Sequence, residues 1–266
     1  MKAKNKYSVT KIFFLLFCLT LLSVSTGFGQ DLALRPLQKL IDCPTAGGPG
    51  FHNYDFNMRL FEEGSILLGI NVGIFKRFNL GVFYGGSNII GFGKPEWNPQ
   101  PGVMVQFRIV NESTAFPAVA LGFNNQGYGL YDKENERYKI KPKGFYAVTG
   151  KYFAFEKAGD YGLHFGINQN PISDEDGRLD LWAAVDYNPF QPIVLIIEYS
   201  AAINDHGRKD SFSDGAGYFN TGIRWSFAER LAVDIHFRDI FNSQKQELRG
   251  GDQIGREVLV SYVESF

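Results

Sequence analysis

Apolar residues alternate with polar or small residues along most of the chain after Tyr54, with a period of two rather than 3.6. This period predicts β-strands with one apolar face instead of helices. Twelve segments follow the pattern, each about as long as the roughly 9–11 residues that a tilted strand needs to cross a bilayer. They are Tyr54–Phe61, Ile66–Phe75, Phe78–Ser87, Val103–Val110, Ala118–Gln126, Phe145–Phe155, Tyr161–Gln169, Leu179–Asn188, Ile193–Ile203, Tyr218–Phe227, Leu231–Phe241 and Arg256–Phe266.

Short and long connections alternate between these segments. Lys76–Arg77 and Ala228–Arg230 are short, for example, whereas Gly127–Gly144 and Asn204–Gly217 are long. Only the turn at Glu62–Ser65 is short where a long loop is due. Such alternation is typical of an up-and-down barrel with its short turns at one end and its long loops at the other. We therefore predict an all-β fold, an antiparallel up-and-down transmembrane β-barrel of about 12 strands.

The two faces of the segments differ in content. Ile66, Leu68 and Ile70 lie on one face of the second segment, and the opposite face carries Gly69 and Asn71. Glycine weakens a solvent-facing strand, but it suits a crowded lumen or a sharply curved sheet. A membrane barrel with lipid outside is therefore the favoured interpretation, and a soluble sandwich or lipocalin-like barrel is the alternative.

Charged residues gather on the glycine-bearing face, where opposite charges can neutralise one another. The predicted lumen-lining residues are Asp55, Arg59, Arg108, Lys151, His164, Asp180, Asp186, Glu198, Arg224, Asp234, His236 and Arg238. Several segments end in aromatic residues, as the interface girdles of membrane barrels do. These are Phe75, Tyr187, Tyr199, Phe227, Phe241 and Tyr262. The final segment, with Tyr262 and the terminal Phe266, looks like the C-terminal assembly signature of bacterial outer-membrane barrels, which implies the outer-membrane assembly machinery as a partner.

The chain before the barrel divides into two parts. Residues 1–30 have a lysine-rich start, an apolar run and small residues near Gln30, which predicts a secretory signal peptide. Residues 31–50 form either a periplasmic segment or a lumen plug. Leu34, Leu37, Leu40 and Ile41 stand at helical spacing there, so we expect a short helix in Leu34–Asp42. Residues 51–266 form the barrel. Removal of the signal peptide leaves Cys43 as the single cysteine of the mature chain.

Composition narrows the function classes. Lys and Arg total 27 against 28 Asp and Glu, which gives a net charge of −1 and provides no basis for nucleic-acid binding. The chain has 30 Gly and 25 Phe, which favours strands over helices. No Gly-x-Ser-x-Gly elbow occurs. His236 lies between Asp234 and Arg238 on one face, where it is either a node of a lumen ion network or a group that polarises water. The charged stretch Tyr131–Lys143 is expected to be an exposed loop.

Three stretches carry a resemblance to a known family. They are Pro44-Thr-Ala-Gly47, Gly122-Phe-Asn-Asn-Gln-Gly-Tyr-Gly129 and Gly144-Phe-Tyr-Ala-Val-Thr-Gly-Lys151. Together they resemble the YjbH-like outer-membrane β-barrel proteins, which are linked to exopolysaccharide systems, over about Pro44 to Asn168. The resemblance implies an outer-membrane location and a role in polysaccharide export or envelope assembly.

The sequence thus leaves three hypotheses. The first is a non-enzymatic barrel in the outer membrane of a two-membrane bacterium, with a narrow or plugged pore and no cofactor or metal. Its partners would be outer-membrane lipids and polysaccharide. The second is a structural or docking barrel that binds a partner through its loops. The third is a membrane-embedded hydrolase that uses Asp234 and His236.

Overall fold

The computed structural model describes residues 38–155, 158–171, 177–206, 211–227, 230–244 and 254–266. The predicted signal peptide and residues 31–37 lie outside the described residues. Within the described residues, no helix has the length and apolar character that a membrane crossing requires.

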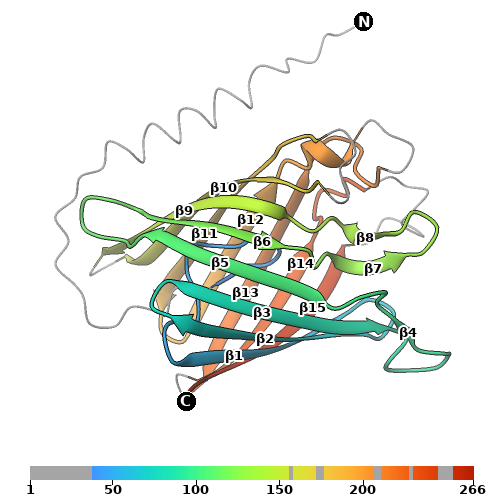
Figure 1. Ribbon diagram of the computed structural model, residues 1–266, viewed down its shortest axis with the longest axis horizontal. Helices are drawn as coiled ribbons and strands as arrows, with labels where there is room; N and C mark the ends of the chain where they lie inside the picture. The colour runs from blue at the N-terminus through green and yellow to red at the C-terminus, as the bar shows by residue number, and fades with distance from the viewer. Residues whose placement is uncertain (1–37, 156–157, 172–176, 207–210, 228–229, 245–253) are drawn as a thin grey trace, which may run out of the picture.

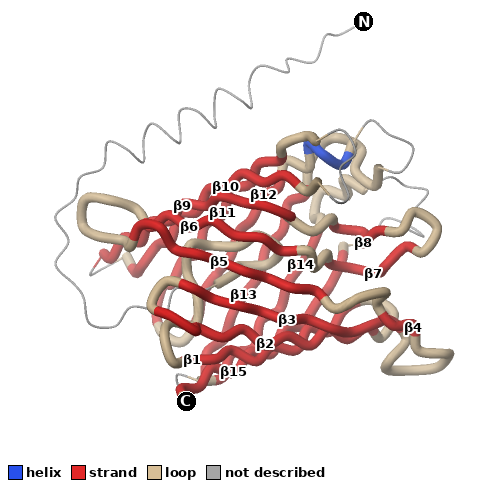
Figure 2. Tube along the Cα trace, in the orientation of Figure 1, coloured by secondary structure: helices blue, strands red, loops and turns tan. Residues whose placement is uncertain are grey.

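Twelve strands of the described chain form one closed antiparallel barrel (Figures 1 and 2). Neighbouring strands follow chain order apart from the short elements β4, β7 and β8, and pairing of β1 with β15 closes the ring. The barrel strands are β1 (Asn53–Phe61), β2 (Ser65–Phe75), β3 (Phe78–Ser87), β5 (Gly102–Val110), β6 (Ala118–Asn124), β9 (Gly144–Phe155), β10 (Gly159–Gln169), β11 (Asp180–Phe190), β12 (Ile193–Ser200), β13 (Tyr218–Phe227), β14 (Leu231–Arg238) and β15 (Gly255–Ser265). The predicted fold class is confirmed.

The long connections contain the remaining elements. The two-residue strand β4 (Glu96–Trp97) pairs with the end of β3, and β7 (Tyr128–Asp132) pairs with β8 (Arg137–Ile140) as a separate hairpin. A single 3₁₀ turn, η1 (Ile203–Asp205), follows β12. These elements lie at one end of the barrel, together with the turn at Glu62–Ser65, whereas the C-terminus and the other short turns lie at the opposite end (Figure 1). We call these the loop end and the turn end.

Period-two alternation decides which side chains face inward. On β2, the outward Ile70 is 44% exposed, whereas its inward neighbour Asn71 is only 4% exposed. The same alternation holds along β14, where Ile235 is exposed and both Asp234 and His236 are buried. Successive side chains of a strand point to opposite faces. A strand whose alternate positions are apolar and polar therefore has an apolar outer face and a polar inner face.

Glycines on the inward face make room for large side chains on the next strand. Gly166 stands opposite Trp182, and a Cβ at this glycine would lie 1.9 Å from the indole ring. Gly222 stands opposite His236, and a Cβ there would lie 2.6 Å from the imidazole. The glycines therefore allow bulky lumen side chains to fold flat against the barrel wall.

The outer face of the barrel is a continuous apolar surface. Soluble monomers rarely expose apolar patches larger than a few hundred Å². Here large apolar side chains are exposed on almost every barrel strand. They include Phe56, Leu68, Ile70, Val82, Phe107, Leu121, Phe145, Ile167, Leu181, Ile197, Ile223, Trp225, Ile235 and Phe237. We call this surface the apolar belt.

Candidate functional site

The structure places almost all predicted lumen residues on the inward face of the barrel. Their side chains are buried or half-buried, even though they point into the lumen of the barrel. The inward residues are Asp55 and Arg59 on β1, Arg108 on β5, His164 on β10, Asp180 and Asp186 on β11, Glu198 on β12, Arg224 on β13, and Asp234, His236 and Arg238 on β14.

The prediction for Lys151 is wrong, because this side chain lies on the outer face. In the register between β9 and β10, Lys151 stands opposite the outward residue Leu163. Its ammonium group reaches the turn end, where it donates hydrogen bonds to the carbonyl oxygens of Ser113 (2.5 Å) and Thr114 (2.9 Å). A lysine near a strand end can thus cover apolar surface with its stem while its charge reaches a polar partner.

Residues 38–50 lie inside the barrel, and we call this segment the plug. Leu40 and Ile41 are fully buried, and Cys43 is 1% exposed. The predicted helix is wrong for the described part of its range, since Gln38–Asp42 contains no helix. The segment instead folds back on itself: the amide of Thr45 donates to the carbonyl of Gln38 (2.9 Å), and Lys39 and Pro44 form an antiparallel bridge.

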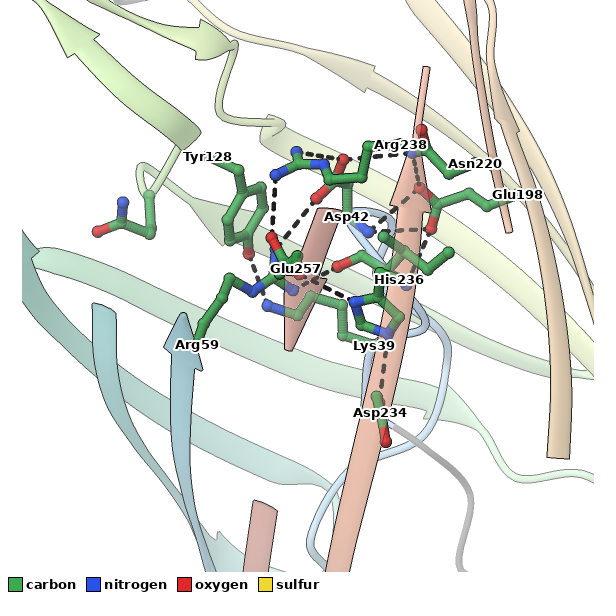
Figure 3. A network of polar contacts seen from close by, with 12 residues as sticks. Lys39, Asp42, Arg59, Tyr128, Glu198, Asn220, Asp234, His236, Arg238 and Glu257 are labelled. Atoms are coloured by element: carbon green, nitrogen blue, oxygen red, sulfur yellow. Dashed lines mark hydrogen bonds and ion pairs between the residues drawn. The ribbon is translucent and has the colours of Figure 1, made fainter. Parts of the chain in front are cut away.

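The carboxylate of Asp42 is the ionic centre of the plug (Figure 3). Arg238 donates from Nη2 to its Oδ2 atom at 2.6 Å, and Arg59 donates from Nη1 to its Oδ1 atom at 3.2 Å. Asn220 adds a longer contact of 3.3 Å to Oδ2. Strands β1, β13 and β14 therefore converge on one plug side chain.

Glu198 holds the backbone of the same turn. Its carboxylate accepts hydrogen bonds from the amides of Ile41 (3.2 Å), Asp42 (3.0 Å) and Cys43 (2.9 Å). The side chain of Glu198 is completely buried, and Asn220 donates to it as well (3.1 Å). A buried charge needs such hydrogen-bonding partners, because its desolvation is otherwise too costly.

Other lumen side chains bind the plug through its carbonyl oxygens. Arg59 donates from Nη2 to the carbonyl of Ile41 at 2.6 Å. Towards the turn end, Arg108 donates to the carbonyl of Ala46 (2.8 Å) and Gln106 to that of Gly47 (2.6 Å). The wall thus satisfies backbone polar groups of the plug at residues 41–43 and at residues 46 and 47.

The plug also has two apolar contacts with the wall. Leu40 and Ile41 pack with Ala184, Val194 and Ile196 of β11 and β12. On the other side, Cys43 and Ala46 pack in a cluster with inward residues of β6, β9 and β11. These residues are Ala118, Ala120, Tyr146, Val148 and Trp182. Apolar side chains inside the lumen are therefore covered by the plug.

His236 belongs to an ion network beside Asp42. Its Nδ1 atom lies 2.9 Å from Oε1 of Glu257, and its Nε2 atom lies 3.4 Å from Oδ2 of Asp234. Glu257 also pairs with Arg238 (3.0 Å) and Arg59 (3.2 Å). His236 and Asp234 are completely buried, so in this conformation no substrate or water reaches them from solvent.

Arg224 joins the same network through Asp234, and the other inward charges make separate contacts. Arg224 holds Asp234 through two hydrogen bonds, the one from Nε being 2.7 Å long. His164 contacts Asp186 through Nε2 at 2.7 Å, and Asp180 accepts a hydrogen bond from the hydroxyl of Ser200 at 3.1 Å. Asp55 accepts a long hydrogen bond from Asn71.

The loops at the loop end fold inward over the lumen. Arg137 of β8 forms a bidentate pair with Asp205 of η1 at 2.6 and 2.9 Å, and Tyr218 donates to the same carboxylate at 3.0 Å. Lys141 and Lys143 are also buried, and Lys143 donates to Ser200 at 2.9 Å. The expectation of an exposed Tyr131–Lys143 loop is therefore wrong for its basic residues Arg137, Lys141 and Lys143.

Sequence reasoning missed several residues of this site. Glu257 lies on the opposite parity to Val258 and Val260, so alternation alone was enough to place it in the lumen. The run Ile193–Ile197 is apolar on both parities, which signals a strand covered on both faces. Asp42 and Asp205 carry no such signal, because they lie outside regular strands.

The predicted assembly residues lie at the turn end of the barrel. Tyr262 is on the outward face of β15, and Phe266 follows that strand with a ring that is 69% exposed. The amide of Phe266 donates to the carbonyl of His52 at 3.0 Å, so the C-terminus is joined to the start of β1. Within the described ranges, no group of three or more His, Cys, Asp or Glu side chains is placed to hold a metal ion.

No protein-family model matches the chain, and no curated protein matches it. Among solved structures, it is similar to a KdgM porin (TM-score 0.45, 11% identity), with 80% of this chain and 99% of that one covered. A NanC porin gives a TM-score of 0.44 at 9% identity, with 80% of this chain and 99% of that one covered. A mutant of the Rh. blastica porin gives 0.35 at 13% identity, covering 80% and 98%. These distant likenesses carry no statement about what this chain transports or binds.

Proposed function

We propose that this protein is an outer-membrane barrel of a two-membrane bacterium whose pore is closed by the plug. Outer-membrane barrels have an outward apolar band flanked by aromatic residues, and the apolar belt supplies such a band. The stacked rings of Tyr161 and Tyr187, with centroids 4.4 Å apart, lie near the turn end of this belt. Lipid is therefore the solvent that this outer face suits.

The proposal that the pore is closed rests on the burial of the side chains that line the lumen. The lumen of an eight-stranded barrel is filled by side chains, whereas a sixteen-stranded barrel encloses an aqueous channel. A barrel of twelve strands is intermediate, so its lumen is either filled by further parts of the chain or open to water and solutes. An open channel would wet Glu198 and Arg59, but these side chains are 0% and 2% exposed. The plug and the loops supply the filling.

The way in which the plug is attached supports a conduit. Within the described residues it adds no strand to the barrel sheet, and it is held by side-chain contacts of the wall. The last four residues of the plug, Gly47-Gly48-Pro49-Gly50, lead to β1 without regular structure. The plug can thus leave without any barrel strand being unpaired, and the lumen that remains is lined by ionic groups suited to polar solutes.

Single-channel recording tests this function. We expect the full chain to be closed in planar bilayers, and a variant lacking residues 31–50 to conduct. A matched control is Glu96→Gln, which changes an exposed ion pair with Lys133 at the loop end and should leave the full chain closed. Absence of current from the folded deletion variant would contradict the conduit.

A docking barrel is the second candidate, and the inward loops favour it. The buried Arg137–Asp205 pair fixes the loop end in one arrangement, which presents a defined surface to a partner. A deletion variant that stays closed while the folded loops bind a partner would support this candidate. The hydrolase hypothesis has less support, because His236 is sealed between Glu257 and Asp234.

We further propose polysaccharide export or envelope assembly as the process that the barrel serves. This part rests on the resemblance of three sequence stretches to YjbH-like proteins. Deletion of the gene should lower the polysaccharide released by the source bacterium, and a plasmid copy should restore it. Unchanged polysaccharide and an intact envelope would remove this assignment.

A further inference from the structure

The wall residues that hold the plug form hydrogen bonds with its peptide backbone. Glu198 accepts three successive amides of the plug, and Arg59, Arg108 and Gln106 donate to the carbonyls of Ile41, Ala46 and Gly47. We define the plug seat as six inward side chains that make polar contacts with plug residues 41–47. They are Arg59, Gln106, Arg108, Glu198, Asn220 and Arg238.

We propose that the plug seat is a peptide-binding site that accepts, in trans, a polypeptide turn carrying an acidic side chain. A protein partner with such a turn would then be the ligand that displaces the plug. The inference uses the position of the plug but does not depend on whether the opened barrel conducts.

The carboxylate part of this recognition is defined by Asp42. Two guanidinium groups, of Arg59 and Arg238, and the amide of Asn220 surround it. Hydrogen bonds to charged groups are stronger than neutral ones. Glu257 pairs with the same two arginines, so a carboxylate of the barrel wall outside the seat balances part of their charge.

The amide part requires a donor chain of fixed spacing. Three consecutive N–H groups converge on one carboxylate only when a peptide turns around it, as Ile41 to Cys43 do around Glu198. If the plug left without a replacement, the carboxylate of Glu198 would lose all three donors. A ligand that replaces the plug without water at this position has to bring equivalent hydrogen-bond donors, and the N–H groups of a peptide turn supply them.

The apolar part distinguishes a peptide from a sugar. Leu40 and Ile41 fit against Ala184, Val194 and Ile196, and these wall residues are at most 5% exposed. Burial of aliphatic side chains of this size is favourable, because it removes apolar surface from water. A polysaccharide has no aliphatic side chains for these surfaces, so the wall favours polypeptide.

A cut-and-rebind experiment tests the proposal on the folded protein. A protease site is inserted between Phe51 and His52, both of which are exposed, and the barrel is cleaved after folding. The cut removes the advantage of tethering, which otherwise raises the local concentration of the plug to about the millimolar range. We expect the severed segment either to stay on the barrel through gel filtration or, once washed off, to be replaced by a synthetic peptide of residues 38–50 added in trans.

Calorimetry with the washed barrel measures the recognition. Peptides with Asp42→Asn, or with an N-methyl group on the amide of Asp42, should bind at least about tenfold more weakly than the parent peptide, since each loses a charge-assisted contact. On the barrel side, Glu198→Gln should weaken the parent peptide similarly, whereas Glu96→Gln should leave its affinity unchanged. The peptides are kept reduced because of Cys43.

Two results would overturn the proposal. One is a heat-modifiable, folded barrel that releases its severed plug and binds none of the peptides. The other is an acidic oligosaccharide that binds the washed barrel as tightly as the parent peptide. Failure of the conduit proposal gives a different result. The washed barrel would then bind the peptide but carry no current either before or after the peptide is added.

Discussion

At the residue scale, single buried side chains of the wall each hold several groups of the plug. Glu198 is the clearest case, because it joins three plug amides and Asn220 while it is itself fully buried. Removal of one partner of a buried charged contact is strongly destabilising, at about 3–5 kcal/mol. Such contacts therefore contribute strongly to holding the plug in the lumen.

Cys43 reports the position of the plug. Its thiol is 1% exposed, and burial raises its pKa well above the ordinary value, with the negative charge of Glu198 adding to the effect. Because the thiolate is the reactive form, we expect no maleimide labelling of the folded protein within the time that labels the unfolded chain fully. Mass spectrometry of quenched samples measures this. Equal labelling rates in folded and unfolded samples would show that Cys43 lies in water.

Glu198→Gln should accelerate that labelling. The amide side chain keeps the shape of the glutamate but offers a neutral acceptor, so the three amides lose a charge-assisted contact worth about 1.5–3 kcal/mol. The plug should therefore leave more often, and the labelling rate of Cys43 should rise by at least about tenfold. Glu96→Gln is the control, because its pair with Lys133 is exposed and such pairs contribute about 0–1 kcal/mol. The same rate in both variants would argue that Glu198 does not hold the plug.

At the element scale, the hairpin β7–β8 and the turn η1 close the loop end together. The bidentate pair between Arg137 and Asp205 joins them, and Arg137 also stacks on the ring of Phe212, 4.3 Å from its centroid. Tyr128, at the start of β7, contacts Lys39 of the plug at 2.9 Å. The hairpin thus lies over the plug rather than apart from it.

Asp205→Asn should loosen this hairpin. The substitution removes the charge partner of a buried guanidinium, at a cost of about 3–5 kcal/mol. Brief trypsin treatment of whole cells should then cut the hairpin at Lys133, Arg137 or Lys139 faster than in the unaltered protein. Glu96→Gln again serves as the control, since it alters only the exposed pair with Lys133. A hairpin that resists trypsin equally in all three proteins would contradict the role of Asp205.

At the scale of the whole molecule, the barrel is built inside out relative to a soluble protein. Its ionic side chains are buried in the lumen, whereas its aliphatic side chains form the apolar belt on the outside. Closure of the sheet through β1 and β15 leaves no unpaired barrel edge, which is the condition for strands in lipid. The proposed membrane location therefore depends on the apolar belt.

Ile235→Lys tests the apolar belt. Ile235 lies in the middle of β14 and is 49% exposed, so a lysine there would face hydrocarbon. The expected loss is about 2–4 kcal/mol of folding free energy in lipid bilayers, as for cations near the midplane of other barrels. Urea titration in vesicles, read from the shift between unboiled and boiled gel bands, measures it.

Phe92→Lys is the matched control, because Phe92 is fully exposed in the loop between β3 and β4. It should change the folding free energy by less than about 0.5 kcal/mol. If both lysine variants were as stable as the unaltered chain, and the protein were recovered without membranes, the apolar belt would not face lipid.

The sequence by itself determined the strands and, in most of them, the inward face. Ile66 to Ile74 and Leu231 to Phe237 keep one strict parity, and parity is a local property that needs no knowledge of partners. In β9 the end of the strand, with Tyr152, Phe153 and Phe155, is aromatic on both parities. The face of Lys151 was therefore decided only by the register with β10, where Leu163 stands opposite.

Only the tertiary structure decided what fills the barrel. The partners of Asp42 lie 17 residues away at Arg59 and 196 residues away at Arg238, so no local pattern could join them. Helical spacing in Leu34–Asp42 gave the wrong conformation for Gln38–Asp42, because the wall of the lumen, through Glu198 and its three amide contacts, satisfies a turn instead. Alternation fixes which way a side chain points, but the group that it meets there depends on how the barrel closes.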